Sequence, residues 1–467
     1  MRWLDYLTGW WPNPFARGVR FRGGVRLAKL RPAIDVPIRP MPLPDCLIVP
    51  VKQHIGEPCE VVVRPGMRVR KGQTLARAVE YLAADIHAPT SGRITKIEDH
   101  RIPHPSGLGA LCVFLEPDGE DEPACELAPL EDWRAASPEA LRERIRRAGI
   151  VGLGGAAFPS FVKLARDPQA PEPMLILNGA ECEPYLSNDA RLMVECADEI
   201  VQGAQLIAHI VQARRIVVAI EDDKPAALRA MAQAARDAEG KTPIEVRAVP
   251  SVYPHGSEKQ LIEALTGREV PAGKLPKDIG VVCHNVGTAR AIWRAVVYGE
   301  PLIERVVTIA GDAVQQPGNW LVRIGTPVRF ALAEAGVADL TEIEIVHGGP
   351  MMGERIPWPE VPTVKSTIGL LAFQKETFWQ AHVPEEPCIR CGHCGQACPA
   401  GLAPNLLMEA CRRGDVEEAE RLALFDCIEC GCCSYVCPAP IPVGHYFRGG
   451  KGLAAEVRRT RAFAAPR

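Results

Sequence analysis

The sequence lacks any continuous apolar run of about 18 residues, the length that a helix needs to cross a bilayer. Its first residues do not have the pattern of a signal peptide, so we expect none, and the sequence carries 17 cysteines. In a long chain of this kind, cysteines are more typical of metal ligands in a reducing compartment than of a disulfide framework. We therefore expect a soluble or peripheral protein whose cysteines bind metal.

A strong net charge is also missing, because 54 Lys and Arg face 57 Asp and Glu, a formal net charge of -3. This balance argues against a nucleic-acid-binding protein. The charge is nevertheless uneven, with a basic N-terminal segment at 1–34, an acidic stretch at 116–132 and a basic tail at 448–467. Basic ends suit an anionic membrane face or an acidic partner, although solvated termini are the simpler alternative.

The first eleven residues place large apolar side chains at helical spacing, which is typical of an interfacial helix. Packing of this helix on its own protein is an equal alternative. The side chains concerned are Trp3, Leu4, Leu7, Trp10 and Trp11.

The length of 467 residues predicts three or four domains. Short β-rich runs broken by Pro and Gly occupy 35–115 and resemble the barrel-sandwich fold of biotinyl and lipoyl carriers. A carrier needs a lysine at the hairpin tip, but the stretch EYLAADIHA (80–88) has none. We therefore expect a β scaffold here, followed by an acidic linker at 116–132.

Helices alternate with β-rich runs across 133–303, which predicts an α/β domain. The expected strands are 174–178, 215–220, 244–249 and 280–285, and the expected helices include one capped by Ser137 and one over about 190–212. Four polar loops occur in this domain, and several of them follow expected strands, where α/β proteins bind ligands. One is a glycine run that follows a helix, so it is no Rossmann fingerprint, but its N–H groups can approach a phosphate, with Lys163 adding charge. The four loops favour a bound nucleotide; they are GLGGAAFP (152–159), NGAECEP (178–184), YPHGSEK (253–259) and HNVGT (284–288).

Two cysteine runs near the end of the chain share the spacing Cys-x2-Cys-x2-Cys-x3-Cys-Pro, and the second repeats the first 39 residues later. Thiolates separated by two other residues can hold three corners of an iron-sulfur cube. A tetrahedral zinc site has no use for the third cysteine of such a run or for the Cys-Pro that follows. The spacing therefore predicts two [4Fe-4S] clusters. The runs are Cys388, Cys391, Cys394 and Cys398 before Pro399, and Cys427, Cys430, Cys433 and Cys437 before Pro438.

The cysteine before each proline can close either cube. In two-cluster ferredoxins this cysteine ligates the other cluster. We therefore expect cluster 1 to use Cys388, Cys391, Cys394 and Cys437, and cluster 2 to use Cys398, Cys427, Cys430 and Cys433. The alternative is two independent four-cysteine loops.

The motifs GLGGAAFPSFVK, NGAECEP, YPHGSEK and HNVGTA resemble those of the flavin- and NADH-binding subunit of respiratory complex I, in the form carried by the C subunit of the Rnf electron-transport complex. The resemblance extends from FRGG at Phe21 to the cysteine runs. It implies a soluble-ligand-binding β-grasp domain at 304–350, a linker at 351–385 and a helical dicluster ferredoxin domain at 386–447. The expected fold class is thus multidomain α/β and α+β.

The resemblance also implies a set of cofactor contacts. It places flavin mononucleotide (FMN) at Gly152, Gly154, Gly155, Lys163, Asn178, Asn285 and Thr288, and NADH near Phe158, Glu183, Tyr253 and Glu258. Two positions depart from the complex I pattern, since Ser257 stands where that subunit has a second acidic residue and Ala157 ends the glycine run.

These features together predict a peripheral, NADH-oxidising subunit of an Rnf-type, ion-translocating NADH:ferredoxin oxidoreductase at the cytoplasmic face of the inner membrane. Its partners would be the other subunits of the complex and, indirectly, ferredoxin or flavodoxin. Two alternatives remain open: a soluble flavin/iron-sulfur protein resembling cobalamin reductases, or an electron-wiring subunit whose flavin fold is empty.

Overall fold

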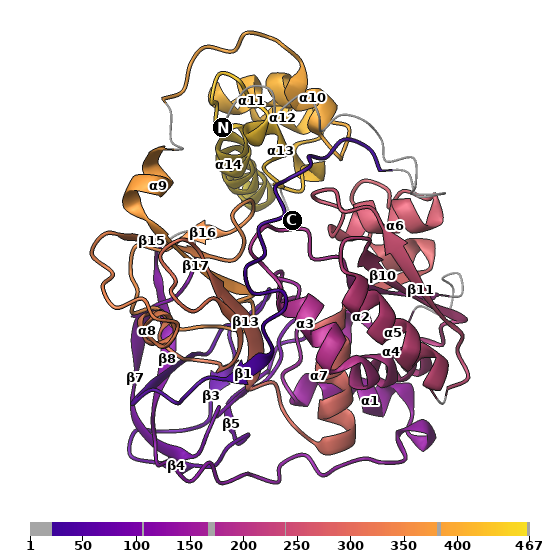
Figure 1. Ribbon diagram of the computed structural model, residues 1–467, viewed down its shortest axis with the longest axis vertical. Coiled ribbons are helices and arrows are strands. Elements are labelled where there is room, and N and C mark those ends of the chain that lie inside the picture. Colours follow the sequence, from indigo (N-terminus) through magenta and orange to yellow (C-terminus); the bar gives the residue numbers. More distant parts are fainter. Residues whose placement is uncertain (1–20, 105–106, 167–172, 239, 381–383, 465–467) are drawn as a thin grey trace. The chain divides into compact units, whose positions relative to one another are not determined.

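The computed structural model describes residues 21–104, 107–166, 173–238, 240–380 and 384–464 (Figure 1). It divides into two compact units. One consists of Lys29–Val249 and Pro276–Thr377, and the other of the described parts of Met1–Ala28, Pro250–Leu275 and Phe378–Arg467. The tryptophan-bearing helix predicted within residues 1–11 lies outside the described residues. Among the described helices, none is both long and apolar enough to cross a membrane.

The larger unit begins with the predicted β scaffold, which consists of two sheets around one apolar core. One sheet has the order β2-β8-β7-β4 and the other the order β3-β5-β6, and every pairing within them is antiparallel. The strands are β2 (Leu47–Pro50), β3 (Glu60–Val61), β4 (Arg68–Val69), β5 (Thr74–Arg77), β6 (Ile86–His87), β7 (Gly92–Arg101) and β8 (Gly109–Pro117).

The acidic stretch predicted to be a linker is bound to this scaffold. Asp121 pairs with Lys71 at 2.5 Å, and Glu126 accepts hydrogen bonds from the N–H and the hydroxyl of Thr74 at 3.1 and 2.6 Å. Asp118 accepts from the Ser91 hydroxyl at 2.6 Å. Carboxylates of this stretch therefore accept hydrogen bonds from the scaffold, and the stretch packs against the scaffold instead of forming a free linker.

A parallel four-stranded sheet with the order β11-β10-β9-β12 forms the predicted α/β domain. Helices α4 and α7 approach each other closely because Gly203 has no side chain, and a Cβ there would lie 2.1 Å from the Ala289 carbonyl oxygen. The predicted helix at 190–212 is in fact two helices that meet at Cys196. The elements are β9 (Met174–Gly179), β10 (Arg215–Glu221), β11 (Ile244–Val249), β12 (Val281–Asn285), α1 (Pro138–Arg147), α2 (Ser160–Lys163), α3 (Asn188–Glu195), α4 (Ala197–Val211), α5 (Pro225–Asp237) and α7 (Val286–Trp293), with short helical turns at Trp133–Ala135, Pro276–Ile279 and Arg294–Tyr298.

A mixed six-stranded sheet with the order β1-β14-β13-β17-β15-β16 completes this unit. The expected β-grasp segment has the order strand-strand-helix-strand, but the sheet also includes residues from both sides of this segment. β1 comes from the segment predicted to open the barrel-sandwich domain, and β17 comes from the predicted linker 351–385 and lies between β13 and β15. The elements are β1 (Ile38–Pro40), β13 (Glu304–Ala310), β14 (Gly318–Arg323), α8 (Val328–Glu334), β15 (Ile343–His347), β16 (Glu354–Arg355) and β17 (Gly369–Gln374).

The linker prediction for 351–385 was therefore wrong over much of its length. It failed because GLLAF is a short, continuous apolar run without alternation. Central strands covered on both faces have this pattern, but other buried segments have it too, so the pattern alone does not identify a strand. Leu370, Leu371 and Ala372 are fully buried.

The smaller unit is helical and contains both cysteine runs. Its spacer between the runs forms α11 and α12 on either side of Gly414. Residues 250–275, which lie within the range expected for the α/β domain, pack in this compact unit. Its helices are α6 (Glu258–Thr266), α9 (Lys375–Gln380, which begins in the larger unit), α10 (His393–Ala397), α11 (Pro404–Arg412), α12 (Val416–Arg421), α13 (Cys432–Tyr435) and α14 (Val443–Ala464), with a helical turn at Leu424–Asp426.

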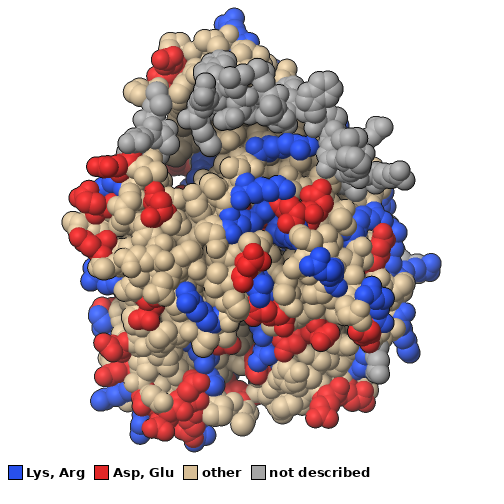
Figure 2. Space-filling view, viewed as in Figure 1, with Lys and Arg blue, Asp and Glu red and all other residues tan. Residues whose placement is uncertain are grey.

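The basic tail is largely the helix α14, and several of its cations pair with glutamates of the same unit. Lys451 binds Glu429 at 2.6 Å, Arg458 binds Glu420 at 2.7 Å, and Arg461 binds Glu417 at 2.9 Å. Figure 2 shows acidic and basic side chains intermixed on the face in view, as expected for a nearly neutral chain.

The position of β17 predicts a difference between two substitutions on that one strand. Leu370→Ala removes a fully buried side chain and is expected to lower the free energy of unfolding by about 2–5 kcal/mol. Gln374→Ala, at an exposed position of the strand, is expected to change it by less than about 0.5 kcal/mol. Chemical denaturation measures both values, and equal effects would mean that 369–374 does not form a core strand.

Candidate functional site

The parallel sheet has a switch point between β9 and β12. After β9 the chain adds β10 and β11 on one side and then β12 on the other. Open α/β sheets bind ligands at the carboxyl ends of their strands at such a point. The register pairs Asn178 with Asn285 there, so two of the predicted site residues are neighbours at these strand ends.

The glycine loop is bound to the start of α7 at this switch point. The N–H of Leu153 donates to the Thr288 hydroxyl at 2.9 Å, and a Cβ on Gly154 would meet the Cβ of Asn285 at 3.3 Å. Asn285 caps α7, because its side-chain oxygen accepts from the N–H groups of Gly287 and Thr288 at 2.8 and 3.3 Å. Asn285 and Thr288 thus hold the loop in place.

The loop presents backbone donors that suit a phosphate. Gly155 has φ +111°, a conformation that favours glycine, and the N–H groups of Gly154, Gly155 and Ala156 make no hydrogen bond within the described residues. The loop is closed by a hydrogen bond from Gly152 N–H to the Phe158 carbonyl at 2.8 Å. Adjacent free N–H groups form an anion-binding concavity. These residues therefore fit the phosphate of a flavin nucleotide.

Lys163 lies at the end of α2, and its ammonium donates to the Cys283 carbonyl of β12 at 3.2 Å. This contact places the cation beside β12, two residues before its last residue, Asn285. The side-chain oxygen of Asn178 accepts from Ala180 N–H at 3.0 Å, which shapes the NGAECEP turn.

Two carboxyl groups after β9, one buried and one partly buried, are not among the predicted site residues. Glu181 accepts from the N–H groups of Asp189 and Ala190 at the start of α3, and Asp189 accepts from the Asn285 side-chain amide. Burial raises the pKa of both groups, and Asp189 raises that of Glu181 further. The only sequence signal is the ECE tripeptide at a strand end, of which the resemblance implies a contact for Glu183 alone.

Glu183 is partly buried and binds a loop that follows β15. Its two carboxylate oxygens accept from the N–H groups of Met351 and Met352, each at 2.9 Å. Burial raises the pKa of this carboxyl group to about 7, although these two hydrogen bonds oppose the shift. Its ionisation therefore changes near neutral pH.

Tyr253 and Glu258 belong to the smaller unit. The Tyr253 side chain is buried, and its hydroxyl donates to the carbonyl of Cys430 at 2.8 Å. Glu258 is the first residue of α6 and is partly exposed. Tyr253, which was predicted to contact NADH, therefore contacts a cysteine run in the structure.

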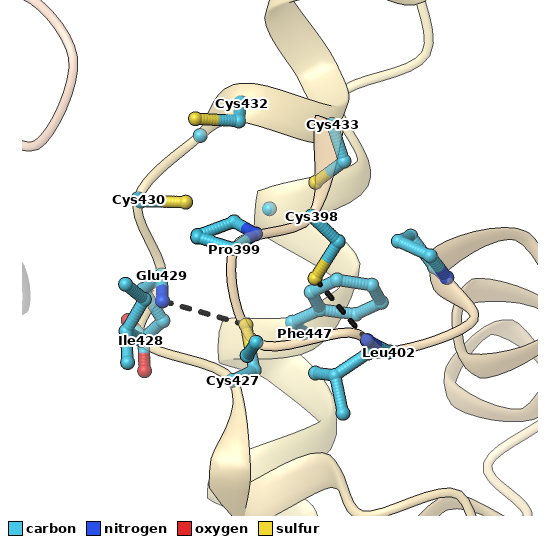
Figure 3. A pocket seen from close by; sticks show the side chains of 14 residues that line it. Cys398, Pro399, Leu402, Cys427, Ile428, Glu429, Cys430, Cys432, Cys433 and Phe447 are labelled. Carbon is cyan, nitrogen blue, oxygen red and sulfur yellow. Dashed lines mark hydrogen bonds between the residues drawn. The ribbon is translucent and has the colours of Figure 1, made fainter. Parts of the chain in front are cut away.

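One pocket of the smaller unit gathers cysteines from both runs. Cys398 and Pro399 from the first run line it together with Cys427, Cys430 and Cys433 from the second, and Phe447 of α14 closes one side (Figure 3). In this view the Cys432 sulfur points away from the others, which agrees with its position outside the motif. Cys398 is therefore close to the second run, where the crossed ligand set requires it.

Sulfur atoms in this pocket accept hydrogen bonds from the backbone. Leu402 N–H donates to Cys398 and Glu429 N–H to Cys427, both at 3.4 Å. Burial raises the pKa of the Cys433 thiol to about 12, helped by Cys430, Cys427 and Cys398. Mutual repulsion of this kind is relieved by a bound cation, because thiolates ligate metal. Among the described residues, no group of three or more His, Cys, Asp or Glu side chains has an arrangement that could hold a single metal ion.

The remaining cysteines of the first run are closer to solvent. Cys388 and Cys391 are exposed and Cys394 is half-buried. Burial, followed by the neighbouring Cys391 and Cys388, raises the pKa of Cys394. These three therefore form a second cysteine group.

Two distant segments line the cysteine runs, and we did not predict this. Gly24 N–H donates to the Ala397 carbonyl at 2.9 Å, and a Cβ on Gly23 would lie 2.7 Å from the Cys398 carbonyl carbon. Val25 and Tyr253 exchange backbone hydrogen bonds of 2.8 and 3.0 Å. FRGG and YPHG therefore form one shell, which we call the cluster shell (Phe21–Val25 and Tyr253–Gly256).

Matches to known families follow the same domain order. They are an RnfC barrel sandwich hybrid domain at 19–120, a Nuo51 FMN-binding domain at 145–294, an SLBB domain at 306–354 and a 4Fe-4S dicluster domain at 382–438. An FMN-binding domain joined to an iron-sulfur domain defines an electron-transferring flavin/iron-sulfur oxidoreductase component.

Relatives of this chain carry a more specific name. The C subunit of the ion-translocating oxidoreductase complex of Yersinia pestis is 48% identical over 94% of this chain and 69% of its own length. Its counterpart in Pectobacterium atrosepticum is 46% identical over 94% of this chain and 62% of its own length. The chain belongs to the family of the C subunits of ion-translocating oxidoreductase complexes, and it spans about two thirds of the length of these relatives.

The multidomain fold class expected from the sequence is thereby confirmed. Among solved structures, an NAD+-reducing [NiFe]-hydrogenase in the H2-reduced state aligns with a TM-score of 0.48 and 21% identity, over 70% of this chain and 65% of that one. This similarity is too low to support an inference.

Tyr253→Phe separates a role at the cysteine run from a role at NADH. It removes the hydroxyl that binds the Cys430 carbonyl and leaves the ring in place. We expect altered electron paramagnetic resonance of one reduced cluster and a KM for NADH within about twofold of the wild type. A raised KM with an unchanged spectrum would return Tyr253 to the nucleotide.

Proposed function

We propose that this protein is the NADH-oxidising, electron-transferring subunit of an Rnf-type ion-translocating NADH:ferredoxin oxidoreductase. The observation that carries the proposal is the glycine loop fixed at the switch point of the parallel sheet, in a chain that also holds the two cysteine runs. A nucleotide site and a cluster site in one chain are what a converter between two-electron and one-electron carriers requires.

Bound FMN would accept a hydride, a two-electron unit, and release electrons singly to iron-sulfur clusters. The chain's own part is to bind and orient. Gly152, Gly154 and Gly155 would present N–H groups to the phosphate with Lys163 adding charge, and Asn178, Asn285 and Thr288 would shape the pocket. Phe158, Glu183 and Glu258 remain the proposed nucleotide contacts.

Two [4Fe-4S] clusters are proposed, with crossed ligands. Cys388, Cys391, Cys394 and Cys437 would hold cluster 1, and Cys398, Cys427, Cys430 and Cys433 would hold cluster 2. The pocket shared by Cys398 and the second run supports this arrangement over two independent loops.

The relatives are named as subunits of a complex, which supports membrane and electron-transfer subunits as partners. We propose a peripheral position at the cytoplasmic face of the inner membrane, with ferredoxin or flavodoxin reached through the complex.

NADH added without oxygen to the full chain is expected to bleach both flavin and iron-sulfur absorbance. Glu183→Gln should keep the flavin but raise the KM for NADH by about tenfold, because a neutral amide accepts ribose hydrogen bonds less well than a carboxylate. Since the pKa of Glu183 is raised to about 7, this carboxylate ionises as pH rises through 7. The KM of the wild type should therefore fall across that range, and the variant should lose this dependence.

The control for this experiment is Glu342→Gln, an exposed glutamate of the same unit. Clusters without flavin in the purified protein would show instead an electron-wiring subunit. An unchanged KM in Glu183→Gln would remove this residue from the nucleotide site.

The crossed ligand set predicts which cluster each cysteine variant damages. A cluster that lacks one thiolate is labile, so Cys398→Ala should affect the same cluster as Cys427→Ala, and Cys437→Ala the same one as Cys388→Ala. Electron paramagnetic resonance of the four reduced variants distinguishes them. If Cys398→Ala and Cys388→Ala lose one common signal that Cys427→Ala retains, each run closes its own cluster. Cys411→Ala, outside the motif, is the matched control.

A further inference from the structure

Two buried cationic side chains, Arg305 and Lys365, bind the backbone at and just before the glycine loop. Arg305 belongs to β13, and Lys365 lies between β16 and β17. Their exposed fractions are 5% and 1%. Full burial of a lysine or arginine is rare and needs compensation by partners.

Lys365 binds the backbone where the chain enters the glycine loop. Its ammonium donates to the carbonyl of Gly149 at 2.7 Å and to that of Asp85 at 3.0 Å. A Cβ on Gly149 would lie 2.8 Å from the ammonium nitrogen, so this approach requires glycine. Lys365 therefore fixes the chain three residues before Gly152.

Arg305 binds the loop itself. Its guanidinium donates to the Leu153 carbonyl at 3.0 Å and to the Lys365 carbonyl. The N–H of Leu153 is meanwhile bound by Thr288. Both polar groups of one loop residue are thus held, and the direction of the N–H groups that follow depends on them.

Neither of these two side chains is paired directly with an acidic group of the described residues, although Asp85 acts on the charge of Lys365 and Asp189 on that of Arg305. Among the described residues, neither side chain has a carboxylate oxygen within ion-pair distance. The carboxylates that act on them bind elsewhere, since Asp85 accepts from Ala78 N–H and Asp189 from Asn285. Burial lowers the pKa of Lys365 to about 8 and that of Arg305 to about 10, so both remain mainly charged at neutral pH.

A buried positive charge without a directly paired counterion is costly, and an anion brought to the same region lowers that cost. The N–H groups of Gly154 and Gly155, which have no partner within the described residues, are the donors that such an anion would use. A phosphate monoester is the anion that a flavin nucleotide carries.

We propose that Arg305 and Lys365 are positioning residues that fix the glycine loop through the carbonyls of Leu153 and Gly149, and that their charge favours the phosphate of FMN. This inference rests on the proposed flavin site. It assigns to the six-stranded sheet a part in cofactor binding that lies outside the matched FMN-binding domain.

The test compares FMN with riboflavin, which lacks the phosphate, by fluorescence quenching on the flavin-depleted full chain. Arg305→Met and Lys365→Met are each expected to weaken FMN binding by at least about tenfold and riboflavin binding by less than about threefold. Arg305→Lys keeps the charge and should recover part of the affinity for FMN. Arg323→Met, a control on the neighbouring β14 whose guanidinium pairs with Asp121 and Glu304, should bind FMN as the wild type does.

A second readout follows the loop without flavin. Hydrogen exchange at the Leu153 amide should be faster in the two methionine variants than in the wild type and the Arg323→Met control. Equal loss of FMN and riboflavin, or FMN affinity equal to that of the wild type, would overturn the charge effect. Unchanged exchange would overturn the positioning role. If Arg305→Met does not fold, Lys365→Met and Arg305→Lys decide the question.

A wild-type chain that binds neither flavin would be a different result. It would mean that the proposed flavin site is wrong, whereas the failures above occur in a wild type that binds FMN.

Discussion

The peptide of Leu153 is the constraint on which the candidate flavin site depends. Its N–H is held by the first turn of α7 and its carbonyl by a buried guanidinium of β13. The glycines that follow can adopt many backbone conformations, so they do not fix their own direction. The supports come from elements more than a hundred residues further along the chain, which makes the loop a product of tertiary structure.

The cysteine runs show the same dependence on distant segments. Their spacing alone provides the thiolates, but the carbonyls of Ala397 and Cys430 are bound by Gly24 and Tyr253. Hydrogen bonding and solvent exclusion around a cluster contribute to its reduction potential. The cluster shell therefore belongs to the redox site as much as the cysteines do.

Much of the fold could be predicted, because periodicity, capping and cysteine spacing are local signals. Ser137 caps α1 as expected, and all four parallel strands lie within a residue or two of their predicted positions. The misses are non-local. Nothing within 351–385 shows that β17 enters the centre of a sheet, and nothing near Lys365 or Arg305 shows that these cations are buried. The carboxylates of 116–132 likewise depend on donors far away in sequence.

The smaller unit is assembled from three separated stretches of chain, and this has a consequence for biogenesis. During synthesis, FRGG and YPHG are made well before the cysteines they cover, and the central strand β17 is finished only shortly before Cys388 leaves the ribosome. Domains generally fold as units once their sequence is complete. The larger unit can therefore close before any cluster is inserted, whereas the surroundings of the clusters can form only after the last cysteine run has been translated. A fragment that begins at the first cysteine run would contain all the cysteine ligands but lack the cluster shell that contacts them.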